Sequence, residues 1–215
     1  MSEFVGSFGP LETGLAAVSL LGFAFYLLLL ERPASLLRTV AKTLAIAALA
    51  ALTLAVGGPK LLALALVLSA LGDAFLAHEG DAAFLGGLGS FLAAHIAYAV
   101  LFLSTGPGLT GVALPGLLAV TAFALAMGFV MVRSAGPLAA PVAAYVLAIA
   151  AMGLGGVTLG GLVLIGVVLF MASDAILGSE KFLMPQNSPL LRLTRPAVWI
   201  LYYSGQVLIT LGLLA

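Results

Sequence analysis

Long apolar stretches, separated by short groups of charged residues, glycines and prolines, make up almost the whole chain. Each stretch has about 19 to 23 residues. A helix rises about 1.5 Å per residue, so this length crosses a hydrocarbon core of ~30 Å. A backbone in lipid must satisfy its own hydrogen bonds, which predicts helices. The eight expected spans are residues 12–30, 36–56, 60–78, 84–104, 109–131, 138–156, 158–178 and 196–214.

Glycine and proline clusters mark several of the boundaries between spans. The strings "GGPK" and "STGPG" end the second and fourth spans, and "GLGGVTLGG" contains the break between the sixth and seventh. Glycines run through this last segment, so its break is the hardest to place. The pattern predicts an all-α bundle of about eight transmembrane helices, with residues 1–215 forming a single integral-membrane domain.

The composition agrees with a polytopic membrane protein. Hydrophobic residues make up 63% of the chain and charged residues 7%, whereas a soluble domain has roughly 25% charged residues. The chain contains no cysteine, which excludes disulfides and a thiol nucleophile. The formal net charge is zero, which gives no reason to expect a nucleic-acid partner. The N-terminus has no basic region of the kind that begins a signal peptide.

The basic residues predict the topology. One of them, Lys60, lies beside an even-numbered connection, and the other seven lie in or beside odd-numbered ones. Basic residues are retained in the cytoplasm, so both termini are expected outside it. The composition, rich in alanine, leucine and glycine, suggests a bacterial inner membrane. The seven are Arg32, Arg38, Lys42, Arg133, Lys181, Arg192 and Arg195.

Two aspartates interrupt apolar helices, in "VLSALGDAFLAH" and "GVVLFMASDAILG". A charged group at the centre of a span costs ~2.5–3.5 kcal/mol, and less near the interface. Asp73 and Asp174 are expected about five and four residues before the cytoplasmic ends of their helices. Either one alone can be a helix-end residue that reaches the interface or pairs with Lys42. Two in matching contexts favour a functional site.

The two aspartate segments also indicate an internal repeat. "LGDAFLA" and "ASDAILG" lie 101 residues apart in spans of the same direction. Two parallel repeats of four helices, related by an axis along the membrane normal, would bring the aspartates near each other. A match this short also arises by chance in a chain of this composition.

Other polar residues are expected in the cytoplasmic half of the bundle, with His95 and Tyr98 deeper than the aspartates. His95 and Tyr98 share a helix face, as do Tyr202 and Gln206. A membrane histidine commonly forms an interhelical hydrogen bond, and tyrosines near Trp199 can belong to an interfacial aromatic belt. Two histidines without cysteine are too few for a zinc site, so no metal is expected.

Several motifs in this order resemble the YhhN-like family of membrane proteins, the lysoplasmalogenase family. They are Lys42 at the head of the second span, "LGDAFL", "FLGGLGSFLAAHIAYAVLF", "PVAAY", "GVVLFMASDAILG" and "YYSGQVLI". The resemblance covers nearly the whole chain and is weaker at the first and fifth spans. The family's motif residues fall on Lys42, Asp73, Phe84, His95, Tyr98, Tyr145, Ser173, Asp174, Tyr202, Tyr203 and Gln206.

The resemblance implies hydrolysis of the vinyl ether bond of a lysoplasmalogen, or of a related ether lipid or lysolipid. The products would be a fatty aldehyde and a glycerophospho-ethanolamine or -choline, and no metal or organic cofactor is required. Asp73 and Asp174 are the expected acid–base pair, with carboxylates about 5–9 Å apart as in paired-carboxylate hydrolases. Lys42 is expected to hold the lipid phosphate. The expected substrate-binding residues are Lys42, His95, Tyr98, Tyr145, Ser173, Tyr202, Tyr203 and Gln206.

Two other functions stay open at the level of sequence. Intramembrane acids also serve proton-coupled lipid or small-molecule transporters. Intramembrane aspartyl proteases place two aspartates on two spans, and "ALGD" resembles their G-x-G-D motif, with Ala70 at the first glycine. The lipid headgroup, the chain length and the oligomeric state are not predicted.

Overall fold

The computed structural model describes residues 8–108 and 114–215, which form helices joined by short connections. The expected all-α fold is confirmed. The described helices are α2 (Pro10–Leu29), α3 (Leu36–Ala55), α4 (Lys60–Leu76), α5 (Asp81–Thr105), α6 (Leu114–Ser134), η1 (Gly136–Leu138), α7 (Ala139–Leu159), α8 (Gly161–Phe182) and α9 (Leu191–Leu214).

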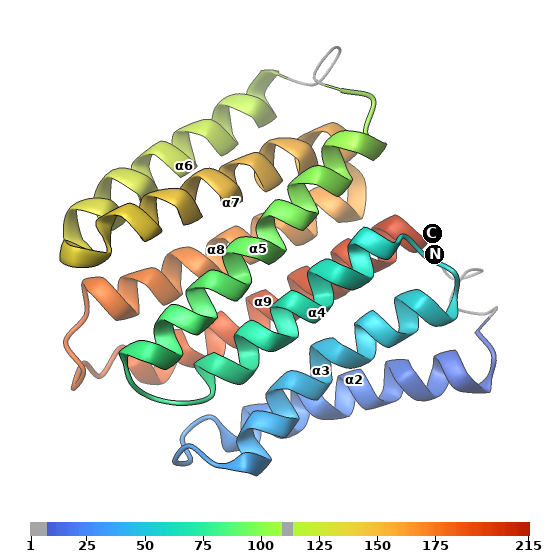
Figure 1. Cartoon of the computed structure of the whole chain (residues 1–215), viewed down its shortest axis with the longest axis horizontal. Coiled ribbons are helices and arrows are strands. Elements are labelled where there is room, and N and C mark those ends of the chain that lie inside the picture. The colour runs from blue at the N-terminus through green and yellow to red at the C-terminus, as the bar shows by residue number, and fades with distance from the viewer. Residues whose placement is uncertain (1–7, 109–113) are drawn as a thin grey trace.

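Seven of these helices are long and apolar enough to cross a membrane. The remaining α-helix, α4, has 17 residues, which at about 1.5 Å per residue is the lower end of what a span needs. The chain is therefore a multi-pass membrane protein. Figure 1 shows the connections α2–α3, α4–α5, α6–α7 and α8–α9 at one end of the bundle. We call this the basic end, because it carries seven of the eight Lys and Arg residues.

Six helices form a closed ring, in the order α3, α4, α5, α7, α8 and α9, with α9 returning to α3. The other two lie outside it: α2 packs on α3 and α6 packs on α7 (Figure 1). In each outer helix, only 17% of an apolar stretch of 18 residues is buried inside the protein. If each helix of α2–α5 is replaced by the corresponding helix of α6–α9, and the reverse, the order of helices around the ring stays the same. This arrangement agrees with the expected pair of four-helix parallel repeats.

The break between α7 and α8 lies at residue 160 and not at residue 157, where it was expected. Gly160 and Gly161 have φ of 66° and 52°, left-handed values that do not occur in the interior of a right-handed helix. The earlier glycines keep helical backbone because neighbouring helices pack against them. A Cβ on Gly155 would lie 2.8 Å from Phe102, and one on Gly156 2.9 Å from Val167. The "GLGG" segment therefore packs helices within one chain.

α8 continues to Phe182, four residues beyond the expected end. Gly178 does not end it, because this position packs against Met131 of α6. Asp174 consequently lies eight residues from the end of the helix, or ~12 Å, and not the expected four residues. α9 begins at Leu191, before Pro196, so the span 196–214 was also too short.

α8 and α9 cross at a pair of glycines. A Cβ on Gly166 would lie 2.7 Å from the carbonyl oxygen of Gly205, and a Cβ on Gly205 would lie 2.7 Å from that of Gly166. No other residue type allows backbones to approach so closely. The crossing brings the next turns of both helices, which carry Phe170 and Tyr202, against each other.

Candidate functional site

Asp174 of α8 is held by residues from two other helices of the ring. The Tyr145 hydroxyl of α7 donates a hydrogen bond of 2.7 Å to Asp174 Oδ2. His95 Nε2 of α5 lies 3.3 Å from the same oxygen. The His95 side chain is fully buried and that of Asp174 is 8% exposed. We call these three residues the Asp174 cluster.

The second ring nitrogen of His95 fixes where its protons lie. Nδ1 is 2.6 Å from the carbonyl oxygen of Phe91. A carbonyl only accepts hydrogen bonds, so Nδ1 carries a hydrogen. A neutral ring would then turn the lone pair of Nε2 toward the carboxylate, which is repulsive. A hydrogen on Nε2 or on the Asp174 carboxyl would replace this repulsion with a hydrogen bond between the two side chains.

Asp73 of α4 forms a second cluster, which we call the Asp73 cluster. Lys42 Nζ of α3 lies 3.3 Å from Asp73 Oδ1, and the Tyr202 hydroxyl of α9 donates a 2.7 Å hydrogen bond to Oδ2. The side chains of Asp73 and Lys42 are 1% and 11% exposed. Lys42 thus pairs with Asp73. From the sequence, this pairing was the structural alternative to a functional role for Asp73. The pair leaves little of the ammonium exposed to a ligand.

The two clusters are built in the same way from the two halves of the chain. Each aspartate contacts one residue of its own half, Lys42 or Tyr145. Each also contacts the last helix of the other half, through Tyr202 or His95. Two halves related by a two-fold axis would produce this cross-pairing.

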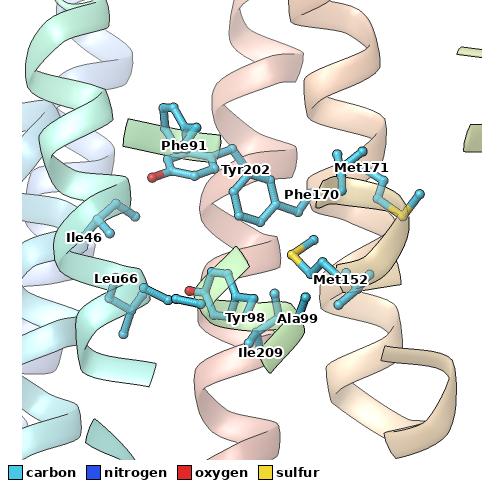
Figure 2. Close-up of a cluster of buried hydrophobic side chains, with 14 of the residues drawn as sticks. Ile46, Leu66, Phe91, Tyr98, Ala99, Met152, Phe170, Met171, Tyr202 and Ile209 are labelled. Carbon is cyan, nitrogen blue, oxygen red and sulfur yellow. The ribbon is translucent and has the colours of Figure 1, made fainter. Parts of the chain in front are cut away.

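An aromatic layer separates the two clusters. The Phe170 ring lies 5.2 Å from the Tyr202 ring and 4.8 Å from the His95 ring, between centroids. Figure 2 shows Tyr202 beside Phe91 and Phe170. Within the described residues no hydrogen bond or ion pair joins Asp73 directly to Asp174. The expected approach of their carboxylates to about 5–9 Å stays a prediction.

A cavity of ≈ 60 Å³ lies between α5, α6, α7 and α8 at the basic end. Among the described residues that line it, Asp174 is the one charged residue and Tyr145 is the other polar one. The remaining lining is apolar and includes two methionines of α6, a residue type that adapts to flexible ligands. Asp73 does not line the cavity. The apolar lining residues are Leu76, Phe84, Leu88, Phe91, Met127, Met131, Val142, Val146, Leu177, Gly178 and Phe182.

The other residues expected to bind substrate connect helices and do not line this cavity. Tyr98 donates a hydrogen bond to Gln206 Oε1, joining α5 to α9. Ser173 donates to the carbonyl of Val198, joining α8 to α9. The Tyr203 hydroxyl lies 3.0 Å from that of Ser19 on α2.

Trp199 does not extend an interfacial aromatic belt. It is 2% exposed, its Nε1 donates to the carbonyl of Phe23, and its ring packs against Tyr26. The α2–α9 contact buries it inside the protein.

The sequence interpretation missed most of the apolar wall of the cavity. Met127 and Met131, four residues apart near the basic end of α6, were the available signal, since this spacing puts both on one face. Nothing in the sequence showed which neighbour that face meets. Among residues 8–108 and 114–215, no group of three His, Cys, Asp or Glu side chains could hold a metal ion.

Comparisons with known proteins give one match. No curated protein and no solved structure matches the chain. The model of the YhhN family matches residues 37–213, which include both clusters and every residue that lines the cavity. The chain therefore belongs to the YhhN family.

Proposed function

We propose that this protein is a membrane hydrolase that cleaves the vinyl ether bond of a lysoplasmalogen or a related 1-alkenyl lysolipid. One observation carries the proposal: among the described residues Asp174 is the single charged one that lines an apolar cavity, and His95 Nε2 lies 3.3 Å from its carboxylate, close enough for the two groups to share a proton. Vinyl ether hydrolysis needs an acid beside a site that accepts an alkenyl chain. Membership of the YhhN family supports the same activity.

The chemistry begins with transfer of the proton of the Asp174 cluster to the carbon of the enol ether that is β to the oxygen. The adjacent carbon and the ether oxygen then share the positive charge of an oxocarbenium ion, which the Asp174 carboxylate stabilises. Water adds to this carbon and gives a proton back to the cluster. The resulting hemiacetal breaks its bond to the glycerol oxygen, which takes the proton that the hemiacetal hydroxyl loses, and a fatty aldehyde is released. The cluster is thus acid first and base second.

The lining of the cavity suits the hydrocarbon part of such a substrate. α5 and α6 both line it, yet these two helices are not among the packed pairs of the described bundle. An alkenyl chain can therefore pass between them toward the bilayer, while the glycerol end points to the basic end. By the distribution of basic residues, we propose that this end faces the cytoplasm.

In this proposal the two aspartates have different roles. Asp174 acts on the substrate. Asp73 lies behind the aromatic layer, has its charge balanced by Lys42, and holds the Tyr202 hydroxyl. We assign Asp73 to positioning of that layer, in place of the symmetrical acid–base pair that the sequence suggested.

The direct test uses purified protein and a 1-alkenyl lysophosphoethanolamine in deuterated buffer. The expected product is a fatty aldehyde with one deuterium on the carbon next to the carbonyl, detected after immediate reduction to the alcohol. A 1-O-alkyl analogue, which has no double bond to protonate, should be untouched. Uptake of intact lipid into proteoliposomes without aldehyde would instead support a transporter, and cleavage of a transmembrane peptide would support a protease.

A further inference from the structure

An ion pair lies at the rim of the cavity. Lys181, in the last turn of α8, places Nζ 3.6 Å from Asp81 Oδ1 at the start of α5. The same Nζ lies 4.5 Å from the centroid of the Phe84 ring. Phe84 and Phe182 line the cavity and pack edge to face. The pair is therefore fixed beside the lining of the cavity at the basic end.

This ion pair is open to solvent, unlike the pair in the Asp73 cluster. The Asp81 side chain is 94% exposed and that of Lys181 is 34% exposed. Exposed pairs of this kind contribute only about 0–1 kcal/mol to stability, so either partner can be exchanged for a ligand at little cost. Lys42, in contrast, would have to leave a buried aspartate before it could bind a phosphate.

We propose that Lys181 and Asp81 bind the zwitterionic headgroup of the lysolipid. The Lys181 ammonium takes the phosphate, and the Asp81 carboxylate takes the amine. The ring of Phe84 lies beneath the Lys181 ammonium, and its aromatic face favours a positive charge at this position. This inference rests on the proposed function, and it adds the residues that select a phosphate with an attached amine over other headgroups.

The position of the pair along α8 fits such a ligand. Lys181 is seven residues after Asp174, which is ~10 Å along the helix axis. The glycerol unit between the vinyl ether and the phosphate covers part of this distance, and the flexible side chain of Lys181 covers the rest. A lipid held at the rim by its phosphate therefore places its vinyl ether at the depth of the Asp174 cluster.

The test measures equilibrium binding of three non-hydrolysable 1-O-alkyl lipids in detergent: the lysophosphoethanolamine, the phosphate monoester and the alkylglycerol without phosphate. In Lys181→Gln, binding of both phosphate lipids should weaken about 5- to 10-fold, as expected for a charge-assisted hydrogen bond, and that of the alkylglycerol should not change. Lys181→Arg should keep most of the affinity. Lys60→Gln, at the other end of the bundle, is the matched control.

Asp81→Asn gives the opposite half of the test. Binding of the lysophosphoethanolamine should weaken about threefold, because an exposed charge pair is weak, whereas the phosphate monoester should bind more tightly without the neighbouring carboxylate. Equal changes for all three lipids, or none, in both variants would overturn the assignment. Headgroup-dependent binding without any aldehyde release would refute the hydrolase and keep this site. Aldehyde release with headgroup-independent binding would support the hydrolase and refute this headgroup site.

Discussion

Two aspartates in similar sequence contexts have different partners in the structure. Oδ2 of Asp174 contacts both a tyrosine and a histidine beside the cavity, whereas Asp73 forms a buried ion pair with Lys42. The sequence identified both residues and most of their partners, since charged groups in apolar helices stand out. It could not show which of them lines a cavity, because that depends on the packing of α6 against other helices.

At Asp73 we expect a large effect on stability. Asp73→Asn leaves the Lys42 ammonium without its partner in a site of low dielectric, which should lower the free energy of unfolding by about 3 kcal/mol. The double variant Asp73→Asn with Lys42→Met removes the charge as well and should recover most of this loss. Unfolding in detergent would measure both. A single variant as stable as the parent protein would show that the pair is not structurally important.

At Tyr145 the effect should be on activity. Tyr145→Phe keeps the ring and removes the hydrogen bond to Asp174 Oδ2, so we expect about a 10-fold lower rate of aldehyde release and a melting temperature lower by a few degrees at most. Tyr26→Phe on the outer helix α2 is the control. An unchanged rate in Tyr145→Phe would remove this hydroxyl from the site.

The helices themselves were largely predictable, because their length is set by the membrane and their sequences are almost purely apolar. Their ends were less predictable. The span around Asp174 was ended too early at Gly178, since a glycine that stops a helix and one that packs against Met131 look alike in sequence. Only the neighbouring helix distinguishes the two cases.

The glycine crossing of α8 and α9 gives a prediction for these elements. Gly205→Ala puts a Cβ 2.7 Å from the Gly166 carbonyl oxygen and should destabilise the protein by about 1–3 kcal/mol, as overpacking does. In Gly14→Ala on α2, the added Cβ would have no neighbouring atom within 4 Å, so this variant should be as stable as the parent protein or slightly more stable. Equal stability of the two variants in thermal unfolding would mean that the crossing tolerates a wider separation.

At the scale of the whole molecule, the ring of six helices places two related clusters inside one bundle. The faint repeat in the sequence indicated this arrangement, but a seven-residue match could not establish it. The cross-pairing of each half with the last helix of the other half was invisible in the sequence, because it depends on contacts between residues up to 129 positions apart.

The orientation of the molecule can be measured directly, because the chain has no cysteine. Cysteine introduced at Ser188, in the α8–α9 connection, should be protected from a membrane-impermeant reagent in intact cells. Cysteine introduced at Ala215, after α9, should be labelled. The positive-inside distribution is the physical reason for this expectation. Labelling of Ser188→Cys alone would reverse the topology and place the cavity mouth outside.

The most direct test of the central claim, that the Asp174 cluster supplies the proton for vinyl ether hydrolysis, is aldehyde release by Asp174→Asn. This substitution keeps the shape of the side chain and removes the carboxyl group that holds the proton or stabilises the oxocarbenium ion. We expect the rate to fall at least about 100-fold, the lower range for general acid–base catalysis, while the variant stays folded and still binds a 1-O-alkyl lysolipid. Glu12→Gln, at the opposite end of the bundle, should keep the parental rate. A rate for Asp174→Asn within about threefold of the parent protein would contradict the account, because no acid–base role is that small.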